Sequence, residues 1–210
     1  MEELDLLKKD WKRNENSYKQ LSEEEIYKMR HRNSSSLVKW ILVISIIEVI
    51  LWTLISVFYS TDDYLQSLNH QELIIYFQTL EYLNYAVILV FIYLFYKNYR
   101  NITTTSTTKQ LMHDIIKTRK TVQYYVWYNL SMIVLGLASG FWLAFTFSPQ
   151  VGILKEKMEA DEKYMAITIG VLLVSVLIAV GIFWLFYRLL YGILLRKLLV
   201  NYRELKKIDF

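Results

Sequence analysis

The 210-residue chain contains no cysteine and only one proline. Without cysteine there can be no disulfide bond, no zinc site with thiolate ligands, no thiol nucleophile and no lipid anchor attached through sulfur. The chain also lacks a phosphate-binding loop, a dinucleotide-binding glycine pattern, a HExxH zinc motif and a nucleophile elbow. The sequence therefore identifies no catalytic residue and no metal site, and it favours a protein that is not an enzyme.

Charge is present, as 24 Lys and Arg and 20 Asp and Glu, but it falls in blocks between long apolar runs. With 54% hydrophobic residues, this distribution excludes a disordered chain and a small all-β domain. A helix needs about 20 apolar residues to cross about 30 Å of hydrocarbon. Four runs meet this requirement, at 40–59, about 75–96, 124–148 and 164–187, and Pro149 ends the third. We expect an all-α, four-helix transmembrane bundle.

The Lys and Arg residues predict the orientation of the spans. Segments 1–39, 97–123 and 188–210 carry 21 of them, whereas the loops 60–81 and 149–163 carry three. Basic residues are retained on the cytoplasmic side, so both termini are predicted to be cytoplasmic in a bacterial inner membrane. This rule and the attraction of anionic lipid headgroups account for the net charge of +4, so we expect no nucleic acid partner. Four aromatic residues are predicted at the inner interface: Trp40, Tyr96, Trp127 and Tyr187.

The two halves of the chain resemble each other. The end of the second span, FIYLFYK, aligns with the end of the fourth, IFWLFYR, and a polar helical stretch precedes both the first and the third span. Two explanations stay open, a tandem duplication and a chance similarity between aromatic-rich span ends. A duplication divides the chain into an N-terminal segment, 1–21, and two units, 22–105 and 106–210. Each unit contains a cytoplasmic helix and a membrane hairpin, which makes a parallel repeat.

Amphipathic stretches outside the spans predict a helical extension on the cytoplasmic side. Ser22 and Glu25 form a capping box, which starts a helix. Three apolar stripes have helical spacing: Ile26, Met29 and Leu37; then Leu111, Ile115, Thr118 and Val122; and, after the fourth span, Tyr191, Leu194, Leu198, Tyr202 and Leu205. The last basic helix either lies on the membrane surface or projects inward and packs on the other two helices.

The N-terminal segment contains a further amphipathic stretch. Leu4, Leu7 and Trp11 share one helical face there. A short face of this kind either covers its own bundle or docks into the groove of a partner. These three residues are therefore candidates for docking a membrane or cytoplasmic protein partner.

Glu48 is the one charged residue of the first span and lies near its middle. A carboxylate at that depth is costly, so it is a candidate functional residue. In that role it relays a proton, coordinates an ion or binds a polar group of a partner. The alternative is a structural role, as a protonated acid that donates a hydrogen bond to Ser45, Asn129, Ser131 or a tyrosine.

Small residues recur at helical spacing in the last two spans. Gly136, Gly140 and Ala144 share a face of the third span. In the fourth span the corresponding residues are Ala166, Gly170, Ser175 and Ala179. Small side chains let helix backbones approach closely. These faces are predicted helix-packing surfaces, either between the two spans of one chain or across a homodimer.

Three segments, LDLLKKDW (4–11), EIYKM (25–29) and SSSLVKWILVISIIE (34–48), resemble a group of small four-span bacterial membrane proteins. Some members of that group carry the name beta-carotene 15,15'-monooxygenase. The resemblance implies a membrane carotenoid-cleaving enzyme with non-haem iron, held by several histidines in or near the spans. This chain has His31, His70 and His113, none of them within a span. No catalytic residue is carried over, and non-haem iron is expected only if that activity applies.

Three classes of function remain. The first is a non-enzymatic accessory or regulatory subunit, which binds its partner through the cytoplasmic helices and the small-residue faces. The second is the carotenoid-cleaving monooxygenase that the resemblance implies. The third is a small transporter or channel that uses Glu48.

Overall fold

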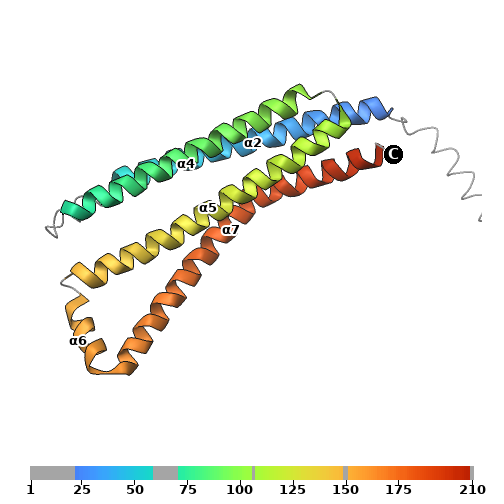
Figure 1. The fold of residues 1–210 in the computed structure, drawn as a ribbon. Helices are drawn as coiled ribbons and strands as arrows, with labels where there is room; N and C mark the ends of the chain where they lie inside the picture. Colours follow the sequence, from blue (N-terminus) through green and yellow to red (C-terminus); the bar gives the residue numbers. More distant parts are fainter. Residues whose placement is uncertain (1–21, 59–70, 106, 149–150, 209–210) are drawn as a thin grey trace, which may run out of the picture.

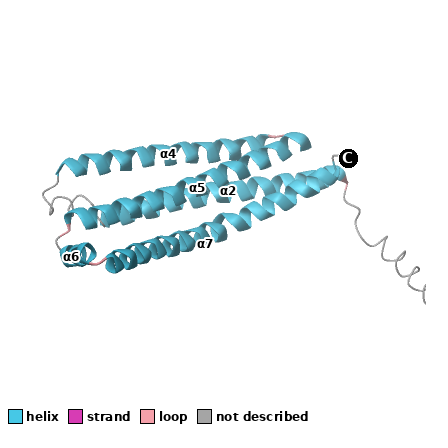
Figure 2. Cartoon of the chain, turned by 60° about the horizontal axis from the view of Figure 1, so that its bottom comes forward, coloured by secondary structure: helices cyan, strands magenta, loops and turns pink. Residues whose placement is uncertain are grey.

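The computed structural model describes residues 22–58, 71–105, 107–148 and 151–208. Within these ranges the chain is helical and contains no strand, as Figure 2 shows. The helices are α2 (Glu23–Phe58), α4 (Gln71–Thr104), α5 (Thr108–Phe147), α6 (Gly152–Ala160) and α7 (Glu162–Ile208). All except α6 are long and apolar enough to cross a membrane. The expected all-α bundle of four transmembrane helices is confirmed.

The helices form two pairs that meet at one end only. Helix α2 packs on α4 and α5 packs on α7, while contacts of α2 with α7 and of α4 with α5 join the pairs. Figure 1 shows the pairs together at the end that holds the start of α2 and the C-terminus. They diverge towards the opposite end, where α6 connects α5 to α7. We call the first part, up to the level of Glu48, the closed half, and the second part the open half.

The core of the closed half follows a heptad pattern. The buried residues of α2 alternate four and three positions apart, at Ser34, Val38, Ile41, Ser45 and Glu48. Helix α5 repeats this spacing at Leu111, Ile115, Thr118, Val122 and Tyr125. A mean repeat of 3.5 residues keeps one stripe of each helix turned towards its partners, as in coiled coils. The same stripe runs from the predicted extensions into the predicted spans, so each pair of segments is one continuous helix.

Polar side chains occupy several positions in this core. The Asn201 side-chain amide donates to the Ser34 hydroxyl at 3.1 Å, which joins α7 to α2. On the other side of the bundle, the Asn98 amide donates to Thr121 Oγ1 at 3.2 Å. Buried polar pairs of this kind are satisfied in one register only, because a shifted helix leaves them without partners. They therefore fix the register of each helix along its neighbours.

Local signals set the helix ends. Ser22 N donates to the Glu25 carboxylate at 3.0 Å and Glu25 N donates to Ser22 Oγ at 3.2 Å, so the predicted capping box is confirmed. Helix α5 begins after Thr107, whose hydroxyl accepts from Gln110 N at 3.4 Å, and it ends at Phe147, just before the proline. Helix α6, between the third and fourth spans, was not predicted.

Of the three apolar stripes predicted outside the spans, those on α5 and α7 face the core of the bundle, and the one on α2 does so only in part. All four predicted residues of the α5 stripe are buried. On α7, Tyr191, Leu198 and Leu205 are buried, so this helix projects and packs on the bundle. In the stripe of Ile26, Met29 and Leu37 the prediction is wrong for Met29, which is 42% exposed. Ile26 is half-buried and Leu37 packs against the core, and the heptad residue Ser34 also faces the core. The burial of Ser34 was not predicted because serine is polar; its hydroxyl accepts a hydrogen bond from Asn201 in the core.

The outer surface of the bundle is apolar where the spans were predicted. Ile47, Val171 and Leu177 are between 58% and 70% exposed, and the apolar runs contain many similar residues. Hydrocarbon accepts such a surface, whereas water does not. Trp40 and Trp127, predicted at the inner interface, are also more than half exposed. The arrangement identifies an integral membrane bundle, and the tandem duplication remains a prediction.

Candidate functional site

Glu48 lies in the middle of the bundle, where the closed half ends. Its side chain is 3% exposed. The hydroxyl of Tyr187 donates to Glu48 Oε1 at 2.5 Å. The hydroxyls of Tyr125 and Tyr191 both donate to Oε2, each at 3.0 Å. We call these four residues the Glu48 cluster, which joins α2 to α5 and α7.

Hydroxyl groups alone satisfy the carboxylate within the described part of the chain. The ion pairs found there are Lys28–Glu24 and Arg30–Glu204, and neither involves Glu48. Hydrogen bonds from O–H groups to a carboxylate are short and stronger than neutral ones, so they offset part of the cost of burying the charge. The three tyrosine hydroxyls therefore surround the carboxyl group of Glu48, as its structural role predicted for a tyrosine partner.

The other predicted partners of Glu48 bond within their own helices. Ser45 donates to the Leu42 carbonyl at 2.8 Å, and Asn129 donates to the Tyr125 carbonyl at 2.8 Å. Ser131 donates to the Trp127 carbonyl at 2.9 Å. Of the predicted partners, the tyrosines therefore form the cluster.

Aromatic packing holds the three tyrosine rings in place. The Tyr125 ring makes edge contacts with Phe91 and Phe95, in both cases with centroids 5.4 Å apart. The rings of Tyr187 and Tyr191 stack at 6.2 Å. Each tyrosine is at most 2% exposed, so Tyr187 faces the core of the bundle and not the lipid, and its predicted depth at the inner interface remains a prediction. One signal in the sequence was available: Tyr187 and Tyr191 are four residues apart and continue the stripe of Leu198 and Leu205.

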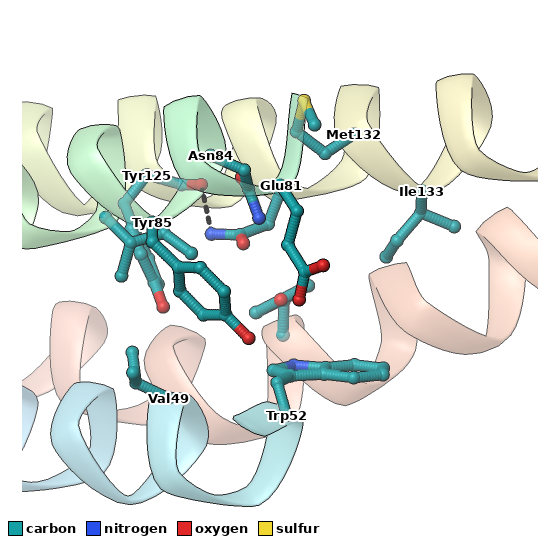
Figure 3. Close-up of a pocket in the computed structure, with 11 residues that line it drawn as sticks. Val49, Trp52, Glu81, Asn84, Tyr85, Tyr125, Met132 and Ile133 are labelled. Carbon is teal, nitrogen blue, oxygen red and sulfur yellow. Dashed lines mark hydrogen bonds between the residues drawn. The ribbon is translucent and has the colours of Figure 1, made fainter. Parts of the chain in front are cut away.

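A cavity of about 230 Å³ adjoins the cluster on the side of the open half. All four long helices contribute to its wall: Val49, Trp52, Glu81, Asn84, Tyr85, Ile88, Tyr125, Asn129, Met132, Ile133 and Tyr187. Figure 3 shows the Glu81 carboxylate and the Tyr85 hydroxyl directed towards Trp52. Glu81 accepts a hydrogen bond from Ser56 at 3.0 Å, and Asn84 accepts one from Tyr128 at 2.9 Å. The cavity is therefore aromatic, and Glu81, the one charged residue among the described residues of its wall, is acidic.

An apolar groove of about 500 Å³ lies on the other side of the cluster, between α2 and α7. Its wall includes Ile47, Leu51 and Phe186, and Glu48 also borders it. Trp52 borders both the groove and the cavity, and its ring contacts Phe183 with centroids 5.8 Å apart. The Glu48 cluster and Trp52 thus separate an aromatic cavity, lined by all four long helices, from an apolar groove between α2 and α7.

The small residues of α5 and α7 do not pack as predicted within the chain. A Cβ atom added at Gly136, Gly140 or Gly170 would meet no atom within 4 Å. The two helices diverge in the open half, so these glycines have no facing backbone (Figure 1). The other predicted small residues lie on the same stretches, with Ala144 and Ala179 half-buried and Ala166 and Ser175 exposed. Packing across a homodimer remains a prediction.

The predicted polar and docking residues outside the spans lie apart from this site. The ring of His31 contacts Tyr27, with centroids 5.8 Å apart, and His113 is exposed on α5. No three His, Asp or Glu side chains come close enough to hold a metal ion within the described ranges. Four predicted residues lie outside those ranges: Leu4, Leu7, Trp11 and His70.

The fold and the site together define a multi-pass integral membrane protein, built as a four-helix bundle around a buried carboxylate. The chain belongs to the family described as "Domain of unknown function (DUF8845)", whose model matches residues 24–210. The match begins one residue after the start of α2. No curated protein and no solved structure matches the chain. Function must therefore be argued from the geometry of the site.

Proposed function

We propose that this protein is a non-enzymatic regulatory subunit of a bacterial inner membrane, with both termini in the cytoplasm. The start of α2 and the end of α7 lie at the same end of the bundle, as an even number of spans requires (Figure 1). Most of the described Lys and Arg residues also lie at that end. The excess of basic residues supports a cytoplasmic position for the closed half.

The position of the Glu48 cluster carries the proposal. Tyr125 and Tyr187 line the cavity of the open half, and both donate to Glu48 in the core of the closed half. A ligand that enters the cavity would touch these rings and change their hydrogen bonds. Because α2, α5 and α7 continue unbroken into the closed half, such a change alters the packing there. A protein partner bound to the closed half would then respond to the ligand.

The chemistry of the cavity favours a small organic cation with an apolar body. Rings of Trp52, Tyr85, Tyr125 and Tyr187 line it, and the faces of aromatic rings attract cations. Glu81 lies in its wall and Glu48 lies directly behind the tyrosines. None of the described residues that line it is basic. An anion would meet like charge here, whereas a cation would be stabilised.

Co-purification tests the regulatory role. The full chain, extracted from native membranes in mild detergent, is expected to retain a stoichiometric protein partner. Deletion of residues 1–20, which contain Leu4, Leu7 and Trp11, is expected to release that partner without unfolding the bundle, because the family match begins at residue 24. A single monodisperse species without a partner, obtained from native membranes, would contradict the proposal.

A transporter is the second candidate, because Glu48 lies between the cavity and the surface groove, near the middle of the first span. In liposomes, Glu48→Gln is then expected to abolish proton or cation flux that the unmodified protein shows. Absence of flux in the unmodified protein rejects this candidate. The carotenoid-cleaving activity implied by the resemblance remains a prediction, and iron bound to the purified protein would support it.

A further inference from the structure

A basic groove lies between α2 and α7 in the closed half, apart from the Glu48 cluster. Its volume is about 480 Å³. Arg196 and Lys197 line it on the α7 side; both are exposed, and neither takes part in the ion pairs found in the described residues. Leu37 and Val200 add an apolar strip, in which Val200 is 48% exposed. None of the described residues in the wall is acidic, so the groove combines free positive charge with apolar surface.

The free charge lies at one end of this groove. Near the start of α2, Arg30 is paired with Glu204 of α7, so its charge is already neutralised. Arg196 and Lys197 precede Glu204 on α7, which runs antiparallel to α2. These two residues therefore lie farther from the start of α2, at the end of the groove that is nearer to the open half.

The N-terminal segment has the complementary pattern in its sequence. Its acidic residues come first, as Glu2, Glu3 and Asp5, and no basic residue lies among residues 1–7. Leu4 belongs to the predicted apolar face of this segment. Acidic and apolar side chains meet their counterparts in the groove if the start of the segment lies at the end of the groove with the free charge.

The chain between this segment and α2 is long enough for that arrangement. Residues 12–21 reach up to about 33 Å when extended. The stretch 30–37 of α2, which lines the groove, lies only about 12–22 Å from Ser22 along the helix. A helix over residues 4–11 and this stretch of α2 are both about 10 Å long. A chain that reverses direction at 12–21 therefore brings the acidic residues to the end with the free charge.

We propose that residues 1–11 occupy this groove of their own chain, as a helix antiparallel to α2. The acidic residues pair with Arg196 and Lys197, and the apolar face covers the strip of Leu37 and Val200. The inference goes beyond the proposed regulatory function and does not depend on it. A partner of the closed half would contact the docked segment as part of one surface, and deletion of residues 1–20 removes that part.

Cross-linking tests this contact, because the chain contains no cysteine and two can be introduced without competing thiols. The variant Leu4→Cys/Val200→Cys, purified as the full chain in detergent micelles, is expected to form an intramolecular cross-link with a short bismaleimide. Leu4→Cys/Lys117→Cys is the matched control, because Lys117 is exposed on α5 and does not line the groove. The control is expected to react at least about tenfold more slowly, since its thiols are not held together. Equal rates, or no cross-link to Val200→Cys, would overturn the proposal.

Charge reversal in the Leu4→Cys/Val200→Cys background tests the complementarity of charge. Arg196→Glu/Lys197→Glu is expected to slow cross-linking at least about fivefold, because attraction becomes repulsion. Adding Glu2→Lys/Glu3→Lys to that variant is expected to restore the rate, since the charges are then exchanged between the two sides. A rate that does not fall, or does not recover, would contradict the proposal.

Lys206→Glu/Lys207→Glu is the control for charge, because both lysines are exposed on α7 and neither lines the groove. It is expected to leave the rate unchanged, and equal slowing by this control would overturn the ion pairs. Far-UV circular dichroism checks that the helices of each variant are intact. If Arg196→Glu/Lys197→Glu does not fold, Lys197→Glu alone is tested in the same way, and an unchanged rate contradicts the proposal.

Other occupants of the groove give different results. A cross-linked dimer would assign the groove to a second copy of the chain. A cross-link that forms in phosphatidylcholine vesicles but is lost in phosphatidylglycerol vesicles would place the segment on an anionic membrane surface. Either result overturns the proposal, which predicts an intramolecular cross-link in both lipids. Since the assay uses the purified chain, a missing protein partner does not affect its result.

Discussion

Tyr187→Phe removes one hydroxyl from the Glu48 cluster and little volume, so its effect can be estimated from the hydrogen bonds. Tyr187 is the one donor to Glu48 Oε1 among the described residues, whereas Tyr125 and Tyr191 share Oε2. A hydrogen bond to a charged group contributes about 1.5–3 kcal/mol. Tyr187→Phe leaves one buried carboxylate oxygen without a donor. We expect it to cost about 2–3 kcal/mol, and Tyr125→Phe or Tyr191→Phe about 1–1.5 kcal/mol each.

Equilibrium unfolding in mixed micelles, titrated with a denaturing detergent and followed by far-UV circular dichroism, measures these costs. Tyr93→Phe is the control, because Tyr93 is 61% exposed on α4; its expected change is within about 0.5 kcal/mol. In a Glu48→Gln background, where the acceptor is neutral, the cost of Tyr187→Phe should fall to about 1 kcal/mol. The reasoning is refuted if Tyr187→Phe behaves like Tyr93→Phe, or if its cost does not change in the Gln background.

Three further substitutions test the open half, the polar core and the pH dependence of stability. Gly136→Leu should change the midpoint of unfolding little, because a Cβ there meets no atom within 4 Å; a large loss of stability, together with dissociation of a dimer, would show that this face packs across a homodimer. Asn201→Leu leaves Ser34 without its donor and should cost about 1–3 kcal/mol in the same unfolding titration; Lys206→Leu, on the exposed face of the same helix, should not. Burial raises the pKa of Tyr27 above its usual value of 10, so this group stays neutral in the folded state while it ionises in the unfolded state. The stability it contributes is complete below pH 10 and is lost as the pH rises further. Above pH 10, the free energy of unfolding of Tyr27→Phe should therefore fall less with pH than that of the unmodified chain. Parallel curves of unfolding free energy against pH would contradict this.

The sequence predicted the features that depend on local composition. The length of the apolar runs predicted the four spans, and the capping box of Ser22 and Glu25 predicted the start of α2. Glu48 was identified because a lone charge in an apolar run is conspicuous. The burial of Tyr187 was missed, because a tyrosine at the end of a span is equally suited to the interface and to the core. The position of the tyrosine in the heptad decides between the interface and the core. That position depends on which face of the helix the other helices cover.

The cavity and the absence of packing at the glycines could not be predicted from the sequence, for a related reason. Gly136 and Gly140 show that a backbone could approach closely, but they do not show that one does. The divergence of α5 from α7 results from long-range packing: the polar core contacts of the closed half fix the helices there, and no equivalent set fixes the open half. A pattern within one helix contains no information about the distance to its neighbour.

Helix α7 extends for 47 residues without interruption. At 1.5 Å per residue this is about 70 Å, more than twice the thickness of the hydrocarbon core. Tyr187 and Tyr191 hold it to Glu48 partway along, and beyond them Asn201 and Glu204 also bind α2, so the C-terminal part is held at several points. The part from Glu162 to Tyr187 is about 37 Å long and diverges from α5 (Figure 1). If this part pivots at Tyr187 as a rigid rod, a tilt of only about 10° displaces its far end by about 6 Å, slightly more than one helical turn. A slight adjustment at the Glu48 attachment is thereby magnified into a large displacement at the opposite end of the bundle.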